Sequence, residues 1–201
     1  MIKAIIFDLW ETLGTKNIGI SKTLRNKFNI EKTPDFLIKY EHAIQLKKFS
    51  SQDELSKSFL NHFDIELLKE NIDFVVNTLN QGITKATLFD GMYELMEKLS
   101  KDYKLGMLSN TTFFESQVPE NLKINHFFEA QVFSWQIGSI KPSFKAFEAI
   151  CSKLNVTPGE AIFVDDGEKN VLAAKEFGLK VIQFRNIEQL KEELKKYLVD
   201  F

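Results

Sequence analysis

The stretch "AIFVDDGEKNVLAAKEFGLKVI", residues 161–182, contains a complete passage from strand to helix to strand. It begins with an apolar run without polar alternation, which is typical of a strand buried on both faces. A helical period then covers residues 168–178 and ends at Gly178, since glycine commonly stops a helix. A second apolar run follows at once. A helix that connects two buried strands predicts a parallel pair, and therefore an α/β fold.

The same pattern is repeated along much of the chain. Amphipathic helical periods at 90–102, 143–155 and 168–178 separate most of the apolar runs. The predicted strands are residues 3–9, 103–110, 130–134, 160–166 and 179–184. We therefore expect a doubly wound, Rossmann-like parallel sheet of five strands.

Residues 16–84 interrupt this alternation, because they contain helical periods and no convincing strand. The periods cover residues 19–29, 34–48, 51–63 and 65–80. Thr33-Pro34 and Ser50-Ser51 have the features of helix starts, namely a capping side chain followed by proline or an acidic residue. We expect an α/β core domain of residues 1–15 plus 85–201, with residues 16–84 inserted as a small all-helical cap domain.

Composition narrows the choice of partners. Lys and Arg number 26 against 28 for Asp and Glu, which gives a net charge of −2. Proteins that bind nucleic acids or anionic membranes usually carry a basic excess, so neither partner is expected. No apolar run approaches the ~20 residues of a membrane span, and we expect a cytoplasmic protein. Cys151 is the only cysteine and is expected to be a buried structural thiol. The sequence leaves the oligomeric state open.

Polar side chains follow four of the predicted strands. Asp8 ends the first, Ser109-Asn110 the second and Asp165-Asp166 the fourth, while Lys141 stands after the third, just before Pro142. The carboxyl ends of parallel strands meet at one edge of the sheet, which is where ligands bind in such folds. We therefore expect these side chains to form one site.

The residue types in this set suit phosphoryl transfer. A carboxylate can attack phosphorus and form an acyl-phosphate. Carboxylate oxygens are also the ligands that Mg²⁺ prefers. A hydroxyl group and an ammonium group can then bind the remaining phosphoryl oxygens and offset their charge.

Four segments in this order resemble the motifs of the haloacid dehalogenase-like hydrolases. They are "IIFDLWETL", "LGMLSNTT", "FSWQIGSIKPSFKAFEAI" and the acidic "AIFVDDGEKNVLAAKEFGLKVI". The resemblance covers nearly the whole chain, and the helical insert lies where many members carry a cap over the site. It implies a hydrolase of the Rossmann-like fold.

The resemblance also implies a role for each matching residue. Asp8 would be the nucleophile and a Mg²⁺ ligand. The backbone carbonyl of Trp10 and the carboxylate of Asp166 would be further ligands, and Asp165 would support the metal or ligate it. Ser109 and the backbone of Asn110 would hold phosphoryl oxygens, and Lys141 would stabilise the nucleophile and the transferring group. Thr12 would contribute to substrate binding by bracing the loop after the first strand.

Trp10 departs from the family pattern, because phosphatases of this family usually have an aspartate there that acts as general acid and base. Indole cannot do either. Three interpretations follow: a Mg²⁺-dependent phosphatase, slow where no other group replaces this aspartate; a non-catalytic or regulatory binding protein; and a 2-haloacid dehalogenase. The dehalogenase needs an arginine for the halide, and only Arg25 stands at a suitable place in the sequence. Two acids at 165–166 would repel a carboxylate substrate.

A phosphatase without that aspartate needs another acid or a good leaving group. Glu41, His42 and Asp53 are candidates from the insert, although we expect all three to face solvent. Glu11 is adjacent to Trp10, but its side chain should leave the backbone in a different direction. An insert that covers the site should exclude polymers, so the expected substrate is a small phosphorylated metabolite.

Overall fold

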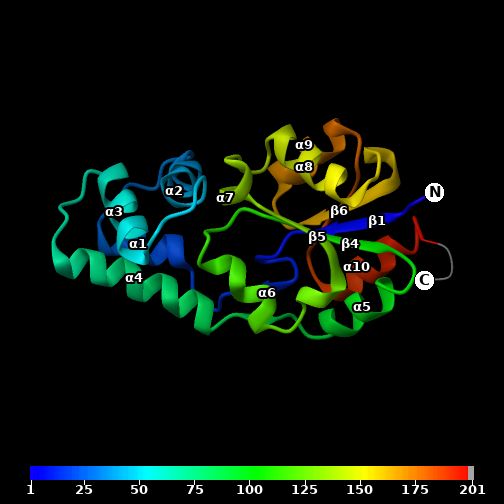
Figure 1. Ribbon diagram of the computed structural model, residues 1–201, viewed down its shortest axis with the longest axis horizontal. Helices are drawn as coiled ribbons and strands as arrows, with labels where there is room; N and C mark the ends of the chain where they lie inside the picture. Colours follow the sequence, from blue (N-terminus) through cyan, green and yellow to red (C-terminus); the bar gives the residue numbers. More distant parts are fainter. Residues whose placement is uncertain (199–201) are drawn as a thin grey trace.

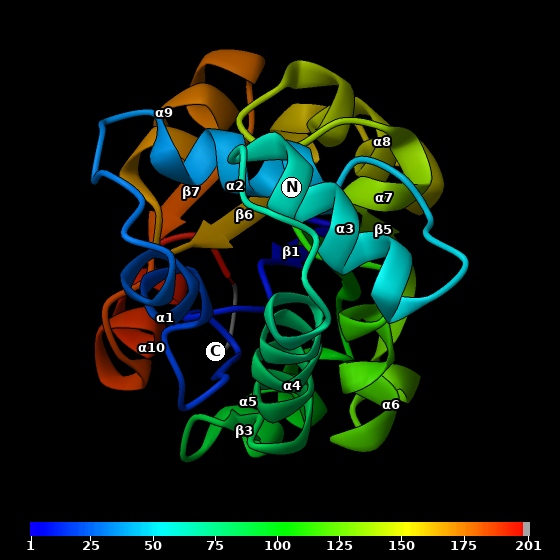
Figure 2. The same ribbon diagram turned by 90° about the vertical axis from the view of Figure 1, so that its left-hand side faces the viewer.

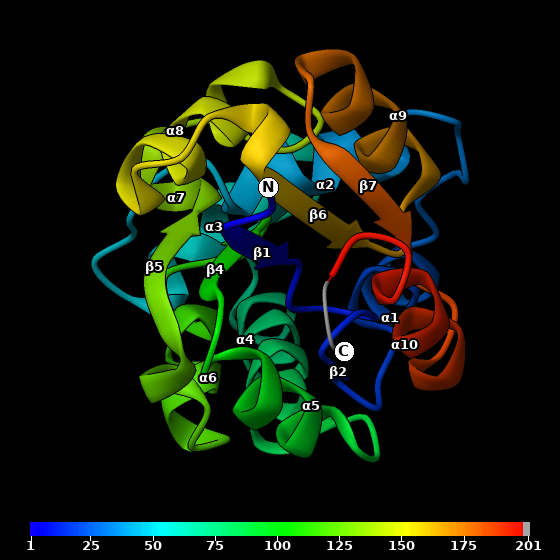
Figure 3. The ribbon, with the colours of Figure 1, turned by 90° about the vertical axis from the view of Figure 1, so that its right-hand side faces the viewer.

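The computed structural model describes residues 1–198, and a five-stranded parallel sheet forms its centre (Figure 3). The strand order is β5-β4-β1-β6-β7, and every neighbouring pair is parallel. The strands are β1 Ala4–Phe7, β4 Lys104–Ser109, β5 Phe128–Phe133, β6 Ala161–Asp165 and β7 Lys180–Gln183. The predicted fold class is confirmed. Four strands are somewhat shorter than the apolar runs that predicted them, whereas β5 begins two residues earlier and ends one residue earlier than the predicted 130–134.

Helices cover both faces of the sheet, which explains why its strands are apolar throughout. Ile5 and Phe7 of β1 point to the face covered by α5 Met92–Leu99 and α10 Ile187–Leu194. Ala4 and Ile6 point to the opposite face, covered by α8 Phe144–Leu154 and α9 Glu168–Phe177 (Figure 1). Full burial of one large apolar side chain contributes ~1.5–3 kcal/mol, so these two layers hold the core together.

Residues 16–84 contain four helices with a hydrophobic cluster of their own. They are α1 Ile20–Lys27, α2 Phe36–Ile44, α3 Gln52–His62 and α4 Lys69–Thr84. Leu24, Leu55, Phe59 and Val75 are fully buried among them. The helices lie beyond the carboxyl ends of the strands (Figures 1 and 2). The treatment of this insert as a separate cap domain stays a prediction.

Two of the three helix ends predicted from local side chains are found in the structure. Ser51 accepts a hydrogen bond from the Glu54 N–H and starts α3 as predicted. Gly178 adopts φ 104° and ends α9, also as predicted. The start expected at Thr33-Pro34 is wrong, because α2 begins at Phe36 and its N-cap Asp35 makes no capping bond.

Several short elements were not predicted. A two-stranded antiparallel ribbon pairs β2 Gly14–Thr15 with β3 Thr87–Leu88, and so joins the two ends of the insert. The others are α6 Val118–Asn121, α7 Ser134–Ile137, α10 and the 3₁₀ turns η1 Glu115–Gln117, η2 Asn125–Phe127 and η3 Pro158–Glu160. Within residues 1–198, no helix combines the length and the apolar character that crossing a membrane requires.

Candidate active site

An ammonium group joins two carboxylates at the carboxyl edge of the sheet. Asp8 follows β1, Asp165 ends β6, and Lys141 lies in the loop before α8. The Lys141 Nζ is 2.7 Å from Asp8 Oδ1 and 2.6 Å from Asp165 Oδ2. All three side chains are buried. The strand order thus brings together residues that are far apart in the sequence, as the strand-end argument predicts.

These buried charges stabilise one another. Burial raises the pKa of Asp8 above its ordinary value, while the charge of Lys141 opposes that shift and Asp165 adds to it. Burial also acts to lower the pKa of Lys141, but Asp165 and Asp8 together outweigh burial and raise it. Lys141 is therefore held as a cation between two acids.

Asp165 is fixed on all sides by hydrogen bonds. Its Oδ1 accepts from the Gly167 N–H at 2.8 Å and from Asn170 Nδ2 at 3.0 Å. A Cβ on Gly167 would lie only 3.0 Å from that oxygen, so glycine permits the close approach. The contact of Asn170 with Asp165 was not predicted from the sequence, because a polar residue in the first turn of a helix does not by itself indicate a site. The contacts make Asp165 a group that positions Lys141.

Asp166 lies beside this group with its side chain exposed. Its backbone N–H donates to Thr12 Oγ1 at 3.1 Å, and its carbonyl accepts from Gln183 Nε2 at 3.1 Å. Thr12 is fully buried, so its hydroxyl braces the Asp166 loop from below. Substrate contact by Thr12 stays a prediction.

The donor set fits a hard divalent cation. Oxygens of Asp8, Asp165 and Asp166 lie within 4.8 Å of one another. Three carboxylates face one ammonium, so negative charge is in excess, and oxygen ligands suit Mg²⁺. Among residues 1–198, no N–H or hydroxyl donates to the carbonyl of Trp10, which leaves that oxygen available. The ligand roles stay predictions.

Ser109 and Asn110 end β4 beside this group. In the described part of the chain the buried Ser109 Oγ has no hydrogen-bond partner, which suits a group that binds a phosphoryl oxygen. The Asn110 side chain accepts from the Lys141 N–H at 2.8 Å and donates to the Lys141 carbonyl at 3.1 Å. Asn110 Nδ2 also donates to Glu41 Oε1 at 3.2 Å, which links the site to the insert.

A cavity of about 530 Å³ opens between the sheet edge and the insert. Residues from both parts line it: Asp8, Trp10, Glu11, Lys16, Ile18, Gly19, Ile20, Ser21, Leu37, Tyr40, Glu41, Gln45, Asn110, Lys141, Asp166 and Asn170. Ser109 and Thr12 lie behind this lining.

The three candidate proton donors of the insert differ in their exposure to solvent. His42 and Asp53 are exposed, as expected. Glu41 is half-buried and lines the cavity, so the expectation that it faces solvent was wrong. The reason is that α2 turns this position toward the site, and the helical period alone did not show which neighbour would cover it. Arg25 does not line the cavity and instead contacts Asn26.

The family of the chain follows from comparison with known proteins. A family model described as haloacid dehalogenase-like hydrolase matches residues 2–178, which include the first three motifs and all but the last four residues of the fourth. The chain belongs to the haloacid dehalogenase-like hydrolases. The resemblance noted in the sequence is confirmed, and a hydrolase is the class to which the family assigns it.

Several relatives of this hydrolase carry phosphatase names. Flavin mononucleotide hydrolase 1 of Arabidopsis thaliana is 27% identical over 152 residues, covering 74% of this chain and 58% of that protein. D-ribitol-5-phosphate phosphatase of Bacteroides thetaiotaomicron is 31% identical over 103 residues, covering 48% and 50%. Glyceraldehyde 3-phosphate phosphatase of Pyrococcus furiosus is 26% identical, covering 98% and 87%. The matches thus span less than two thirds of the length of the first two relatives.

Solved structures share the fold of this hydrolase. A family enzyme from Bacteroides thetaiotaomicron, solved in complex with magnesium and inorganic phosphate, superposes with a TM-score of 0.69. It is 22% identical, and the match covers 92% of this chain and 95% of that one. At this identity the likeness concerns the fold.

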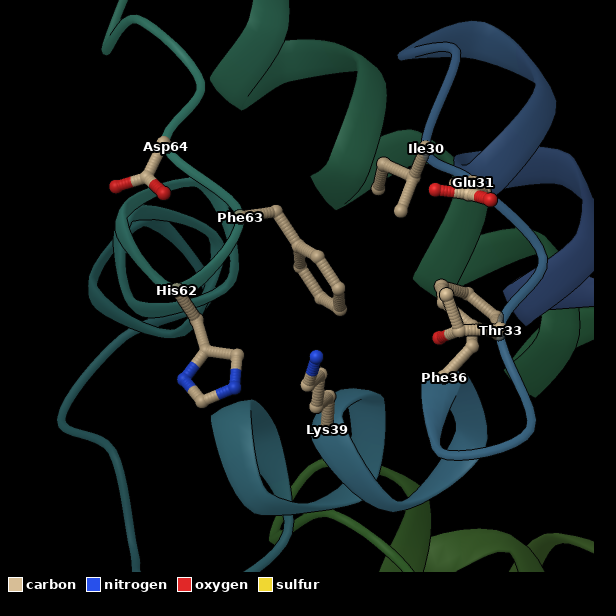
Figure 4. A pocket seen from close by; sticks show the side chains of 8 residues that line it. All are labelled: Ile30, Glu31, Thr33, Phe36, Lys39, His62, Phe63 and Asp64. Atoms are coloured by element: carbon tan, nitrogen blue, oxygen red, sulfur yellow. The ribbon is translucent and has the colours of Figure 1, made fainter.

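A second cavity of about 320 Å³ lies within the insert (Figure 4). It is lined by Ile30, Glu31, Thr33, Phe36, Lys39, His62, Phe63 and Asp64. None of the residues in the four family motifs lines this cavity.

Proposed function

We propose that this chain is a Mg²⁺-dependent phosphatase that acts on a small phosphorylated metabolite through an aspartyl-phosphate on Asp8. The observation that carries the proposal is the buried group in which Lys141 bridges Asp8 and Asp165 beneath a cavity. A scaffold or binding module has no need to bury these charges, because each of them costs free energy when it leaves water.

The nucleophile in this proposal is Asp8. Lys141 keeps one of its oxygens, Oδ1, in a fixed position and favours its ionised form. An oxygen of Asp8 attacks phosphorus, the bond between phosphorus and the ester oxygen breaks, and the aspartyl-phosphate forms. Water then attacks phosphorus, which restores Asp8 and releases inorganic phosphate.

The phosphoryl group is held by groups that surround Asp8. The unpaired Ser109 hydroxyl, the Asn110 backbone and the Lys141 ammonium bind its oxygens and offset their charge. Asp8, Asp166 and the Trp10 carbonyl would hold Mg²⁺, and Asp165 would position Lys141 beside them. When bound, Mg²⁺ offsets the negative charge that the carboxylates and the phosphoryl group bring together.

The substrate class rests on cavity size and on the relatives. A volume of about 530 Å³ lies in the range of small-molecule sites. The names of three relatives give flavin mononucleotide, D-ribitol 5-phosphate and glyceraldehyde 3-phosphate as what those proteins act on. We infer a small phosphate ester for this chain and expect no nucleic-acid partner, given its net charge of −2.

The test is phosphate release from a panel of small phosphate esters with and without Mg²⁺. The wild type is expected to release phosphate from at least one ester, and removal of Mg²⁺ by a chelator should abolish release. Asp8→Asn should lose activity by at least about 10⁴-fold, because it cannot form the covalent intermediate. The exposed insert variant Asp53→Asn serves as the matched control and should retain full activity.

Two outcomes would contradict the proposal. A wild type that binds Mg²⁺ but releases phosphate from no ester would favour the non-catalytic binding protein. Activity that survives in Asp8→Asn would place the nucleophile elsewhere. The dehalogenase interpretation gains no support from the site, because Arg25, the one arginine in a suitable place, does not line the cavity.

A further inference from the structure

The aromatic side chain at position 10 leaves the site without a proton donor where the family pattern has an aspartate. Trp10 Nε1 donates to Thr111 Oγ1 at 3.4 Å, and the Lys16 Nζ lies 4.4 Å from the centre of the Trp10 ring. Lys16 in turn forms an ion pair with the buried Glu115. Trp10 is therefore held in place from two sides and has no group that transfers protons near neutral pH.

Breaking the ester bond of an alkyl phosphate needs a proton, because an alkoxide is a poor leaving group. The cavity lining contains four acids, Asp8, Glu11, Glu41 and Asp166. Asp8 is the proposed nucleophile and Asp166 a proposed metal ligand, so Glu11 and Glu41 remain for proton transfer.

Glu41 stands on α2 and reaches into the site from the insert. Its Oε1 accepts a hydrogen bond from Asn110 Nδ2 at 3.2 Å. Asn110 is itself fixed by two hydrogen bonds to the backbone of Lys141, whose Nζ contacts Asp8. Within the described residues Asn110 is the only donor to this carboxylate, so the second oxygen of Glu41 is available to a substrate. The carboxylate thus has a defined place relative to the nucleophile.

The surroundings of Glu41 favour the protonated form more than water does. Burial raises the pKa of Glu41, while the hydrogen bond from Asn110 and the charges of Lys141 and Lys16 oppose that shift. Asp165 adds to it, and the neighbouring Tyr40, which also lines the cavity, is neutral because burial raises its pKa. A carboxyl group that carries a proton closer to neutral pH is a better general acid.

Glu11 is less suited to the same task. It is exposed to solvent, and its Oε1 already accepts a hydrogen bond from the Thr15 hydroxyl at 2.8 Å. These contacts tie Glu11 to the ribbon residue Thr15, and no hydrogen bond joins it to Asn110 or Lys141.

We propose that Glu41 is a catalytic residue that replaces the missing aspartate as the proton donor and acceptor. This inference rests on the proposed phosphatase function. As Asp8 bonds to phosphorus and the ester bond breaks, the Glu41 carboxyl gives its proton to the leaving oxygen. The Glu41 carboxylate then takes a proton from the attacking water while the bond between phosphorus and Asp8 breaks. The second hydrogen of the water stays with the released phosphate.

The test compares Glu41→Gln on two kinds of ester with Mg²⁺. Glutamine keeps the size of the side chain and the acceptor for Asn110 but cannot transfer a proton. The value of kcat/KM reports the steps up to formation of the aspartyl-phosphate. For an alkyl phosphate such as glycerol phosphate, we expect kcat/KM to fall by about 10²- to 10⁴-fold. For para-nitrophenyl phosphate, whose leaving group needs little protonation, it should change less than about threefold.

Two further readouts separate proton transfer from a merely structural role. The fall in alkyl phosphate activity at high pH should be present in the wild type and absent in Glu41→Gln. Adding Trp10→Asp to Glu41→Gln should restore alkyl phosphate activity, because it supplies an acid at the position where the family has one.

Each other outcome has a definite meaning. Equal losses on both esters, or no loss on either, would overturn the role of Glu41 while leaving the proposed function intact. A loss restricted to alkyl phosphates in Glu11→Gln, with Glu41→Gln unaffected, would transfer the role to Glu11. Wild-type protein that is inactive on both esters would overturn the proposed function and, with it, this inference. Asp53→Asn should match the wild type on both esters.

Discussion

At the scale of single residues, the site buries charged side chains, and their ion pairs and hydrogen bonds offset the free-energy cost of burial to different degrees. Lys141 is buried and satisfied by two carboxylates, and Asp165 is further fixed by Gly167 and Asn170. Asp8 has fewer stabilising contacts, and burial therefore raises its pKa. A buried carboxylate with a raised pKa destabilises the folded protein wherever the pH keeps it ionised.

Because the ionised Asp8 destabilises the folded protein, we expect Asp8→Asn to be more stable than the wild type when no metal is bound. The folded-state pKa of Asp8 lies above its ordinary value of 3.8, so its favourable contribution is complete below pH 3.8 and is lost as pH rises through the folded pKa. At pH 8 we expect Asp8→Asn to be more stable than the wild type by on the order of 1 kcal/mol. The difference should shrink toward pH 4. Thermal unfolding in chelator at several pH values measures it, and a less stable Asp8→Asn at pH 8 would contradict the account.

For the ion pair of Lys16 and Glu115 we expect the opposite effect, namely that replacing the acid lowers the stability of the folded protein. Glu115 is fully buried, and burial acts to raise its pKa, but Lys16 and Thr112 outweigh burial and hold the pKa below its ordinary value. Its stabilising effect is present above about pH 4.5 and is lost as pH falls through the lower folded pKa. Glu115→Gln leaves Lys16 without its charged partner and should cost on the order of 3 kcal/mol at pH 7.

The matched control is Glu129→Gln, which removes the surface pair with Lys104. Because both side chains of that pair are partly in solvent, the loss should stay below about 1 kcal/mol. Urea unfolding at pH 7 compares the two variants. Equal losses in both would mean that burial adds nothing to the pair of Lys16 and Glu115.

At the scale of elements, the β2–β3 ribbon holds together the two points where the insert leaves and rejoins the core. Gly14 is decisive there, because a Cβ at this position would lie 2.3 Å from the Thr87 carbonyl oxygen. Gly14→Ala must separate the two strands, and we expect a loss of ~1–3 kcal/mol.

The control for that change is Gly159→Ala, since no atom lies within 4 Å of a Cβ there. It should change stability by less than about 0.5 kcal/mol. Urea unfolding of both variants measures the difference. If Gly14→Ala were as stable as Gly159→Ala, the ribbon would have no part in fixing the insert.

At the scale of the whole molecule, the cavity lies where the helical insert packs over the carboxyl edge of the sheet. The core supplies Asp8, Lys141 and Asp166, and the insert supplies Tyr40 and Glu41. The single hydrogen bond between Asn110 and Glu41 joins residues that are 69 positions apart. The proposed chemistry therefore needs residues from both the α/β core and the insert.

The core half of this arrangement could be predicted from the sequence. Residues such as Asp8 and Asp165 end apolar runs, and parallel strands bring their ends to one edge. The insert half could not. A helical period places Glu41 on a face of α2, but only the packing of α2 over the sheet decides what that face meets. Short elements such as β2 and α7 contain too few residues for a period to be recognised.

Trapping the phosphoryl group on Asp8 would test the proposed aspartyl-phosphate without relying on a particular assay of turnover. The protein would be mixed with Mg²⁺ and a turnover substrate, quenched in acid within milliseconds to seconds, and mapped by peptide mass spectrometry. We expect one phosphoryl group on the peptide that contains Asp8, and none in Asp8→Asn. Phosphate release without any adduct on that peptide, or an adduct on Asp165 or Asp166 instead, would contradict it.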